Sequence, residues 1–247
     1  MRVLLTGAAG GIGSAATAEL RARGAQVIGL DLDGGHDVIA CDVREQASVD
    51  AAVAAAIERL GGLDVLINNA GIGTPQGAGT RPDERALAVI DVNLLGPWRV
   101  TAAAIDALRA SRGRVINIAS GLAHLALPYG TAYCMSKRGL TAYSDALRLE
   151  HGDAITVTTI YPGYIRTPIH DESRAAGIGL EGRVPAERVE DAARTIARAA
   201  LGPPARDLAT TRSGAVGYAV MRHMPRRWLD AIVRRRLERV GITLPAS

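Results

Sequence analysis

A tyrosine and a lysine four residues apart are the pair in this sequence best suited to proton transfer. Tyr133 and Lys137 stand in the stretch TAYCMSKRG, and Lys137 is the only lysine among 29 Lys and Arg residues. Arginine is always protonated and wide, whereas a lysine ammonium is compact and can approach one oxygen closely. On a helix, residues i and i+4 lie on one face. The spacing therefore predicts that the phenol and the ammonium share one site, although such a pair also arises by chance.

A glycine-rich loop near the start of the chain could bind phosphate. The stretch TGAAGGIG, residues 6–13, lies between a strand-like run and an alanine-rich helical segment. Glycines allow a tight turn and let the backbone approach a pyrophosphate at the helix N-terminus. The loop alone is also compatible with a plain structural turn. Asp31 follows Gly13 by 18 residues and ends the second predicted strand, where a ribose-binding carboxylate is expected. Together these features predict a dinucleotide site.

The surroundings of Asp31 favour NAD(H) over NADP(H). Its carboxylate can accept both hydroxyls of the adenosine ribose and would repel a 2′-phosphate. Ile12 precedes the last loop glycine and Leu32 follows Asp31, so no cation is expected beside a 2′-phosphate. The alternative is that Asp31 is only a solvated acid at a strand end.

Strand-like and helix-like segments alternate along the chain. Because the strands are continuous apolar runs, this rhythm predicts a parallel sheet with helices on both faces. The expected fold is α/β, a single Rossmann-type doubly wound sheet. The segments expected to be strands are 2–6, 26–31, 37–42, 63–71, 113–120 and 154–163, and those expected to be helices are 12–23, 48–60, 82–110, 130–150 and one that begins near Pro185.

Length and composition suit one large domain. The chain has 247 residues, of which 48% are hydrophobic and 22% are charged, as in ordinary globular proteins. No apolar run reaches about 18 residues, and the first predicted strand begins at Arg2, so neither a membrane span nor a signal peptide is expected. The two cysteines, Cys41 and Cys134, suggest reduced thiols in a cytoplasmic protein and lack metal-ligand spacing.

The net charge of +4 is concentrated at the end of the chain. From Ala219 to Ser247 there are seven arginines and two acids, which sum to +5, so the remainder sums to −1. A basic tail on a near-neutral body is poor evidence for nucleic-acid binding. We therefore expect a catalytic domain over residues 1–205 and a basic helical extension of the same domain over 206–247.

Six motifs together make the sequence resemble the short-chain dehydrogenase/reductase family, in its single-domain branch. The likeness spans residues 1 to about 200, and the motifs occur in the family's order and spacing. They are TGAAGGIG (6–13), NNAG (68–71), DVNLLG with Asn93, INIAS ending at Ser120, YCMSK (133–137) and YPGYIRTP (161–168).

The resemblance implies a role for each member of a catalytic set. Tyr133 would be the general acid/base that exchanges a proton with the substrate oxygen. A free phenol has a pKa near 10, and a neighbouring ammonium would lower it. Lys137 would supply that ammonium and bind the nicotinamide ribose. Ser120 would hydrogen-bond the substrate oxygen, and Asn93 would hold a water leading to solvent, unless it only bends a helix.

The resemblance also implies cofactor-binding and substrate-flanking positions. NNAG could equally be a structural turn, and His124 a surface-loop residue. The expected cofactor residues are Thr6, Gly7, Gly11, Ile12, Gly13, Asp31, Asp42, Val43, Asn69, Ala70, Gly71, Tyr133, Lys137, Pro162, Gly163, Ile165 and Thr167. The expected substrate-flanking residues are Leu122, His124, Leu125, Leu127, Tyr164 and Ile169, and the segment 171–184 is expected to be a lid or a surface loop.

Three functions remain open at this point. The first is an NAD-dependent oxidoreductase that interconverts a secondary alcohol and a ketone, on a lipophilic substrate because the flanking residues are apolar. The second is a 3-ketoacyl-thioester reductase. The third is a dinucleotide-sensing protein with a dead site, against which the intact Ser120, Tyr133 and Lys137 argue. The resemblance implies a homo-oligomer, a dimer or a tetramer. The chain departs from the family's common ending, which leaves the usual tetramer contacts open.

A basic amphipathic helix is predicted from Trp228 to Val240. Its apolar positions recur at helical spacing with arginines among them. We expect it to pack on its own body or on a second subunit. Contact with an anionic membrane surface is the less favoured alternative. The apolar positions are Leu229, Ile232, Val233, Leu237 and Val240, and the arginines are Arg227, Arg234, Arg235 and Arg239.

Overall fold

A seven-stranded parallel sheet forms the centre of the protein. The computed structural model describes residues 1–178, 181 and 184–239. The strand order is β3-β2-β1-β4-β5-β6-β9, and all six neighbouring pairs are parallel. This confirms the predicted doubly wound fold. The strands are β1 (Arg2–Thr6), β2 (Gln26–Asp31), β3 (Val38–Ala40), β4 (Val65–Asn68), β5 (Arg114–Ile118), β6 (Thr156–Tyr161) and β9 (Asp207–Ala209).

Both faces of the sheet are buried, which explains the continuous apolar runs in the sequence. In β1, Val3 and Leu5 contribute to the core on one face and Leu4 to the core on the other, and all three are fully buried. Successive strand side chains point to opposite faces, so a strand covered on both sides favours apolar residues at consecutive positions.

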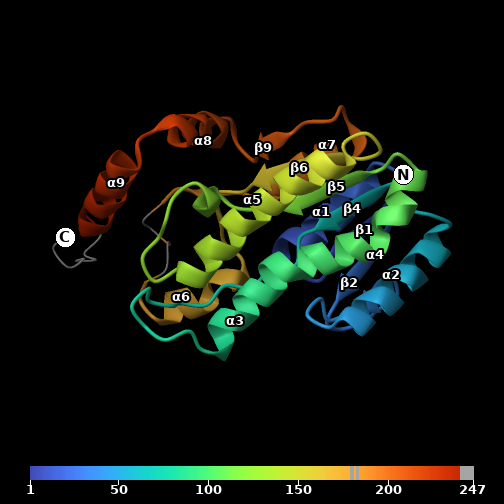
Figure 1. The fold of residues 1–247 in the computed structure, drawn as a ribbon, viewed down its shortest axis with the longest axis horizontal. Coiled ribbons are helices and arrows are strands. Elements are labelled where there is room, and N and C mark those ends of the chain that lie inside the picture. The colour runs from blue at the N-terminus through green and yellow to red at the C-terminus, as the bar shows by residue number, and fades with distance from the viewer. Residues whose placement is uncertain (179–180, 182–183, 240–247) are drawn as a thin grey trace.

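Helices cover the two faces in separate layers (Figure 1). The first face is covered by α2 (Gln46–Leu60), α4 (Gly96–Ala110) and α5 (Thr131–His151). The second is covered by α1 (Gly11–Ala22) and α7 (Val189–Leu201). Small alanines on α2 and α7 let these helices approach the sheet closely, which fits a chain without phenylalanine.

The strand order creates a crevice at the carboxyl edge of the sheet. From β1 the chain moves outward to β2 and β3, and it then returns to place β4 on the other side of β1. In open parallel sheets, ligands bind where the order reverses in this way. The crevice therefore lies beyond the carboxyl ends of β1 and β4, next to the glycine-rich loop.

Two predicted helices differ from those observed. The stretch 82–110 divides into α3 (Glu84–Ile90), a π-helical turn (Asp91–Leu95) and α4, and Asp83 caps α3 by accepting from the backbone N of Ala86 at 2.8 Å. The helix predicted to begin near Pro185 begins only at Val189.

The segment after Pro185 is extended instead. Ala186–Glu187 forms β8, which pairs with β7 (Tyr164–Ile165) inside a stretch predicted to be a loop. The Glu187 carboxylate accepts a hydrogen bond from Gly163 N at 2.9 Å, and this contact holds the chain extended before α7. The same stretch also contains the short helix α6 (Asp171–Ala175), while residues 179–180 and 182–183 of the predicted lid lie outside the described residues.

The C-terminal part of the chain contributes to the sheet and then leaves it. Strand β9 pairs with β6, and α8 (Arg212–His223) and α9 (Arg226–Arg239) follow. In Figure 1 both helices lie at one end of the molecule, beyond the sheet. The predicted helix position Val240 lies outside the described residues. None of the described helices is long and apolar enough to cross a membrane.

Candidate functional site

One large cavity opens at the carboxyl edge of the sheet. Its volume is about 1200 Å³, larger than the roughly 300–1,000 Å³ that suits one small ligand. The walls come from the glycine-rich loop, from the ends of β2, β4, β5 and β6, from the start of α5, and from α8 and α9. It therefore has room for a dinucleotide and a second molecule together.

The glycine-rich loop leaves the N-terminus of α1 open to this cavity. Gly7 has a positive φ of 67°, and a Cβ on Gly13 would collide with the carbonyl oxygen of Gly7. No side chain caps α1, its first turn has no acid, and Gly10, Gly11 and Ile12 line the cavity. Uncapped N–H groups at a helix N-terminus attract anions. The loop therefore fits a pyrophosphate.

Thr6 and Asn69 tie the loop to the end of β4. The Thr6 hydroxyl accepts from the backbone N of Asn69 and of Ala70, each at 3.0 Å. The Asn69 amide donates to Thr6 O at 3.0 Å and to Gly7 O at 3.1 Å. Thr6 and Gly13 thus do not line the cavity themselves, and they support the conformation of the loop that does. Asn69, Ala70 and Gly71 form part of the wall itself.

The Asp31 carboxylate is held at the edge of the cavity by two backbone groups. One oxygen accepts from Ala9 N and the other from Leu32 N, each at 2.8 Å. Each carboxylate oxygen has a second lone pair, so Asp31 can still accept from a ribose. Leu32 beside it is 66% exposed and contributes no charge.

A cation that the sequence did not lead us to expect lies on the same cavity wall. Arg44 lines the cavity together with Asp42 and Val43. Its guanidinium pairs with the Asp42 carboxylate at 2.6 Å, and this hydrogen bond holds the pKa of Asp42 below its usual value. In this structure the Arg44 guanidinium is thus engaged with Asp42.

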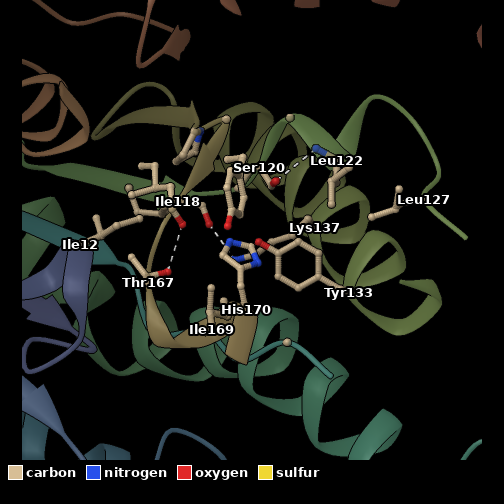
Figure 2. Close-up of a pocket in the computed structure, with 18 of the residues that line it drawn as sticks. Ile12, Ile118, Ser120, Leu122, Leu127, Tyr133, Lys137, Thr167, Ile169 and His170 are labelled. Carbon is tan, nitrogen blue, oxygen red and sulfur yellow. Dashed lines mark hydrogen bonds between the residues drawn. The ribbon is translucent and has the colours of Figure 1, made fainter. Parts of the chain in front are cut away.

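Ser120, Tyr133 and Lys137 come together from two elements (Figure 2). Ser120 follows β5, and its hydroxyl accepts from Leu122 N at 3.1 Å. Tyr133 and Lys137 lie one turn apart on α5, with the Lys137 ammonium 5.7 Å from the centre of the Tyr133 ring. All three side chains line the cavity. The juxtaposition expected from their spacing is therefore present.

Burial shifts the titration of this pair in opposite directions. Loss of water raises the pKa of Tyr133 to about 12, while its hydrogen bond with Ser120 acts to lower it. Burial also lowers the pKa of Lys137 to about 8. Lys137 is 4% exposed and donates to Ile118 O at 2.9 Å. At neutral pH the phenol therefore carries its proton, and the ammonium keeps its charge and two further N–H donors.

Asn93 is fully buried beneath this group and braces a neighbouring turn. It lies in the π-helical turn, donates to Ile72 O and accepts from Ile72 N, each at 2.9 Å. A Cβ on Gly71 would lie 3.3 Å from the Asn93 side-chain oxygen and 3.5 Å from the Lys137 ammonium. Asn93 thus lies near the Lys137 ammonium but is not one of the residues that line the cavity.

Most of the other predicted residues line the cavity, with His124 as the exception. The His124 ring packs 4.6 Å from Tyr161 and 5.2 Å from Tyr218, centre to centre, and its burial lowers its pKa. His124 therefore packs under the loop after β5 and is not among the residues that line the cavity. The lining residues are Pro162, Gly163, Ile165 and Thr167 among those expected for the cofactor, and Leu122, Leu125, Leu127, Tyr164 and Ile169 among those expected for the substrate.

Glu187 and His170 are among the lining residues that were not expected from the sequence. The Glu187 carboxylate accepts from Gly163 N and from the Thr211 hydroxyl, both at 2.9 Å. His170 packs 4.9 Å from the Tyr164 ring, and burial lowers its pKa, so its imidazole is neutral. Glu187 belongs to no motif, because its partners lie far away in the chain. His170 lies two residues after the end of the YPGYIRTP motif and could have been found from that position.

Comparison with known proteins agrees with this fold and site. A short chain dehydrogenase family model matches residues 1–177, and the chain belongs to that family, the short-chain dehydrogenases/reductases. It is similar to a protein named as a ketoacyl reductase of the granaticin polyketide synthase in Streptomyces violaceoruber, with 34% identity over 72% of each chain. It is also similar to human retinol dehydrogenase 16, with 35% identity over 70% of this chain and 59% of that protein.

A solved structure extends the likeness over almost the whole chain. A short-chain dehydrogenase from Burkholderia cenocepacia, in complex with NADP, superposes with a TM-score of 0.79 at 27% identity and covers 94% of this chain and 96% of that one. The chain is thus an oxidoreductase of this family that uses a nicotinamide dinucleotide.

Proposed function

We propose that this protein is an NAD(H)-dependent oxidoreductase that interconverts a secondary alcohol and a ketone on a lipophilic substrate. The observation that carries the proposal is the meeting of Ser120 and Tyr133 on a cavity wall, with the Lys137 ammonium beside them. The same cavity is lined by Asp31 at the end of β2. The apolar residues that also line it include Leu122, Leu127 and Ile169 (Figure 2).

Tyr133, Ser120 and Lys137 have different roles in proton transfer at the substrate oxygen. In the reducing direction the Tyr133 hydroxyl donates its proton to the carbonyl oxygen, and in the oxidising direction the phenolate takes the alcohol proton. Ser120 hydrogen-bonds the same oxygen and fixes its position. Burial raises the pKa of Tyr133, whereas the Lys137 ammonium together with the positive charge of an oxidised nicotinamide would favour the phenolate. The free N–H donors of Lys137 would bind the nicotinamide ribose. Asn93 keeps the turn beside Lys137 in place. The bound nicotinamide supplies or accepts the hydride at the carbinol carbon.

The choice of NAD(H) rests on Asp31. Its carboxylate is fixed by two backbone N–H groups and can accept from ribose hydroxyls, and a 2′-phosphate beside it would be repelled. Arg44 is engaged with Asp42. The structural relative in complex with NADP belongs to the same family, so the cofactor preference depends on these local charges and not on the fold.

A 3-ketoacyl-thioester reductase is the second candidate function. It is favoured by the relative named as a ketoacyl reductase. Both candidates use the same reacting groups and differ in what binds the far end of the substrate.

We place the enzyme in the cytoplasm and expect a homo-oligomer, a dimer or a tetramer.

An absorbance screen at 340 nm tests the proposal. Secondary alcohols, ketones and 3-ketoacyl thioesters are each assayed with NAD(H) and with NADP(H). We expect the highest kcat/KM with NAD(H) and an apolar ketone or its alcohol. Turnover of thioesters alone would support the second candidate, and no turnover of any compound would favour a dinucleotide-sensing protein.

A further inference from the structure

Helix α9 forms part of the cavity wall. Leu229, Ile232, Val233, Arg236 and Leu237 of this helix line the cavity. They recur at spacings of three, four, seven and eight residues and so occupy one face of the helix. Leu229 and Leu237 are only 5% and 8% exposed. The basic tail is therefore a component of the ligand site, and this face packs toward the protein's own cavity.

Helix α8 connects this wall to the reacting groups. A Cβ on Gly121 would collide with the Tyr218 hydroxyl, so α8 touches the turn that directly follows Ser120. Tyr218 and Met221 of α8 line the cavity as well. The lining also includes Leu122, Leu125 and Leu127 of the loop after β5, with Ile178 after α6. The compartment beside Ser120 and Tyr133 thus has apolar walls from three parts of the chain.

The charged side chains on the cavity wall are almost all engaged. Asp42 and Arg44 pair with each other, Asp191 pairs with Arg194, and Glu172 pairs with Arg85. Arg188 contacts Glu190 at 3.2 Å. Asp31 and Glu187 accept from the backbone groups described above, and Lys137 donates to a carbonyl.

Arg236 is the exception. It lines the cavity, yet it makes no hydrogen bond or ion pair with any residue that the structure describes. An arginine fork is well suited to the two oxygens of a carboxylate or a phosphate. Next to it on the same helix face are the apolar Ile232, Val233 and Leu237. The wall thus offers an apolar surface with one unengaged cation.

We propose that α8 and α9 form a subsite for an anionic lipophile, with the apolar chain along α9 and the acidic group at Arg236. Only one part of this proposal rests on the proposed function, namely the reaction at the end of the substrate near Tyr133. Binding of the acidic end at the subsite does not require turnover. It places the chemistry at a ketone or alcohol within the chain, away from the acidic end. A fatty acid and a lipid or carrier phosphate share this chemistry, and the probes below separate them.

Tryptophan fluorescence can measure binding directly. The protein has two tryptophans, Trp98 and Trp228, and Trp228 lies on α9. In a Trp98→Phe background, Trp228 alone reports on α9. The probes are decanoate, dodecanoate, dodecyl phosphate and dodecan-2-ol, titrated below their micelle concentrations. We expect each methylene added from decanoate to dodecanoate to tighten binding about fourfold.

A pair of arginine variants tests the charge. Arg236→Gln keeps a polar side chain of similar length and removes the cation, and Arg235→Gln makes the same change at an exposed position outside the lining. We expect Arg236→Gln to weaken dodecanoate binding at least tenfold and to leave dodecan-2-ol unchanged, while Arg235→Gln changes neither. A larger loss for dodecyl phosphate than for dodecanoate points to a phosphate-bearing lipid or carrier, and the reverse points to a fatty acid.

A second pair of variants tests the apolar wall. Ile232→Glu places a carboxylate in the lining, whereas Val216→Glu does so at a 66% exposed position of α8 outside it. Ile232→Glu should weaken both dodecanoate and dodecan-2-ol. Equal effects of the two arginine variants, or binding unaffected by Ile232→Glu, would overturn the subsite. These are binding measurements, so they are independent of turnover. If the wild type turned over no alcohol, ketone or thioester in the absorbance screen, the proposed function would fail while the subsite would stand.

Discussion

Lys137 is the residue at which activity and stability conflict most directly. Its pKa falls from 10.5 to about 8 in the folded protein because its ammonium is buried. The unfolded chain therefore binds the proton more tightly, which works against folding. This penalty is fully present below pH 8 and disappears as the pH rises from 8 to 10.5. Its size is on the order of 3 kcal/mol.

Replacement of Lys137 by methionine should therefore stabilise the protein. We expect Lys137→Met to raise Tm at pH 7 by about 5 °C and to abolish turnover, with the gain in Tm shrinking toward pH 10.5. Lys137→Arg should also lose activity, because the wider fork does not fit beside Tyr133. Calorimetry against pH checks the first result. A methionine variant less stable than the wild type at pH 7 would show that burial of the ammonium does not destabilise the folded protein.

Asp31 should decide the cofactor preference. Replacing Asp31 by serine together with Leu32→Arg removes the repelling carboxylate and adds a cation beside it. We expect the ratio of kcat/KM for NAD(H) to that for NADP(H) to fall at least a hundredfold. Asp33→Asn makes a similar change of charge at an exposed position outside the cavity and should leave the ratio unchanged. A wild-type enzyme that prefers NADP(H) would contradict this explanation.

The positions of site residues that belong to local sequence motifs could be predicted from the sequence. Ser120, Tyr133, Lys137 and the glycine-rich loop lie where their spacing indicates, since each depends on one strand end or one helix turn. His124 illustrates the limit of this reasoning. Its position after Ser120 suggested a ligand contact, but packing against Tyr161 and Tyr218, from β6 and α8, turns the ring behind the wall.

At the scale of elements, the β7–β8 pair is the feature that local pattern could not predict. Pro185 is typical of a helix start, yet the chain stays extended until Val189. The reason is long-range, because the Glu187 carboxylate is held by Gly163 on one side and by Thr210 and Thr211 on the other. The π-helical turn that buries Asn93 likewise follows from its contacts with Ile72.

Glu187 should act as a positioning residue for the turn after β6. All of its partners are hydrogen-bond donors, so Glu187→Gln turns an amide N–H toward at least one of them. We expect a loss of about 1–2 kcal/mol of stability and a several-fold rise in KM for the cofactor, with a smaller change in kcat. Glu190→Gln, at an exposed position outside the cavity, is the matched control. A cofactor KM equal in the two variants would mean that Glu187 is only structural.

At the scale of the whole molecule, the apolar parallel strands made the fold predictable. Alternating apolar strands and amphipathic helices leave few arrangements that bury both faces of the sheet. The course of the tail was harder to predict, because an amphipathic helix shows which face is buried but not what covers it. The structure turns that face of α9 toward the cavity.

Removal of the tail helix should therefore open the cavity. Deletion of residues 226–247 keeps β9 and α8. We expect it to raise KM for dodecan-2-one about tenfold or more. Cofactor affinity should stay unchanged, because none of the residues expected to bind the cofactor lies on α9. Light scattering after size exclusion would show whether assembly changes as well. Unchanged kinetics and assembly, combined with lost binding to anionic vesicles, would instead make α9 a membrane-surface helix.

The central claim is that Tyr133 transfers the proton to the substrate oxygen. It is tested most directly by single-turnover reduction of dodecan-2-one with NADH at 340 nm, comparing the wild type with Tyr133→Phe. The Phe variant lacks only the hydroxyl, so NADH should still bind while the rate falls by about a thousandfold or more. A Phe variant that reduces the ketone at a near wild-type rate would contradict the claim.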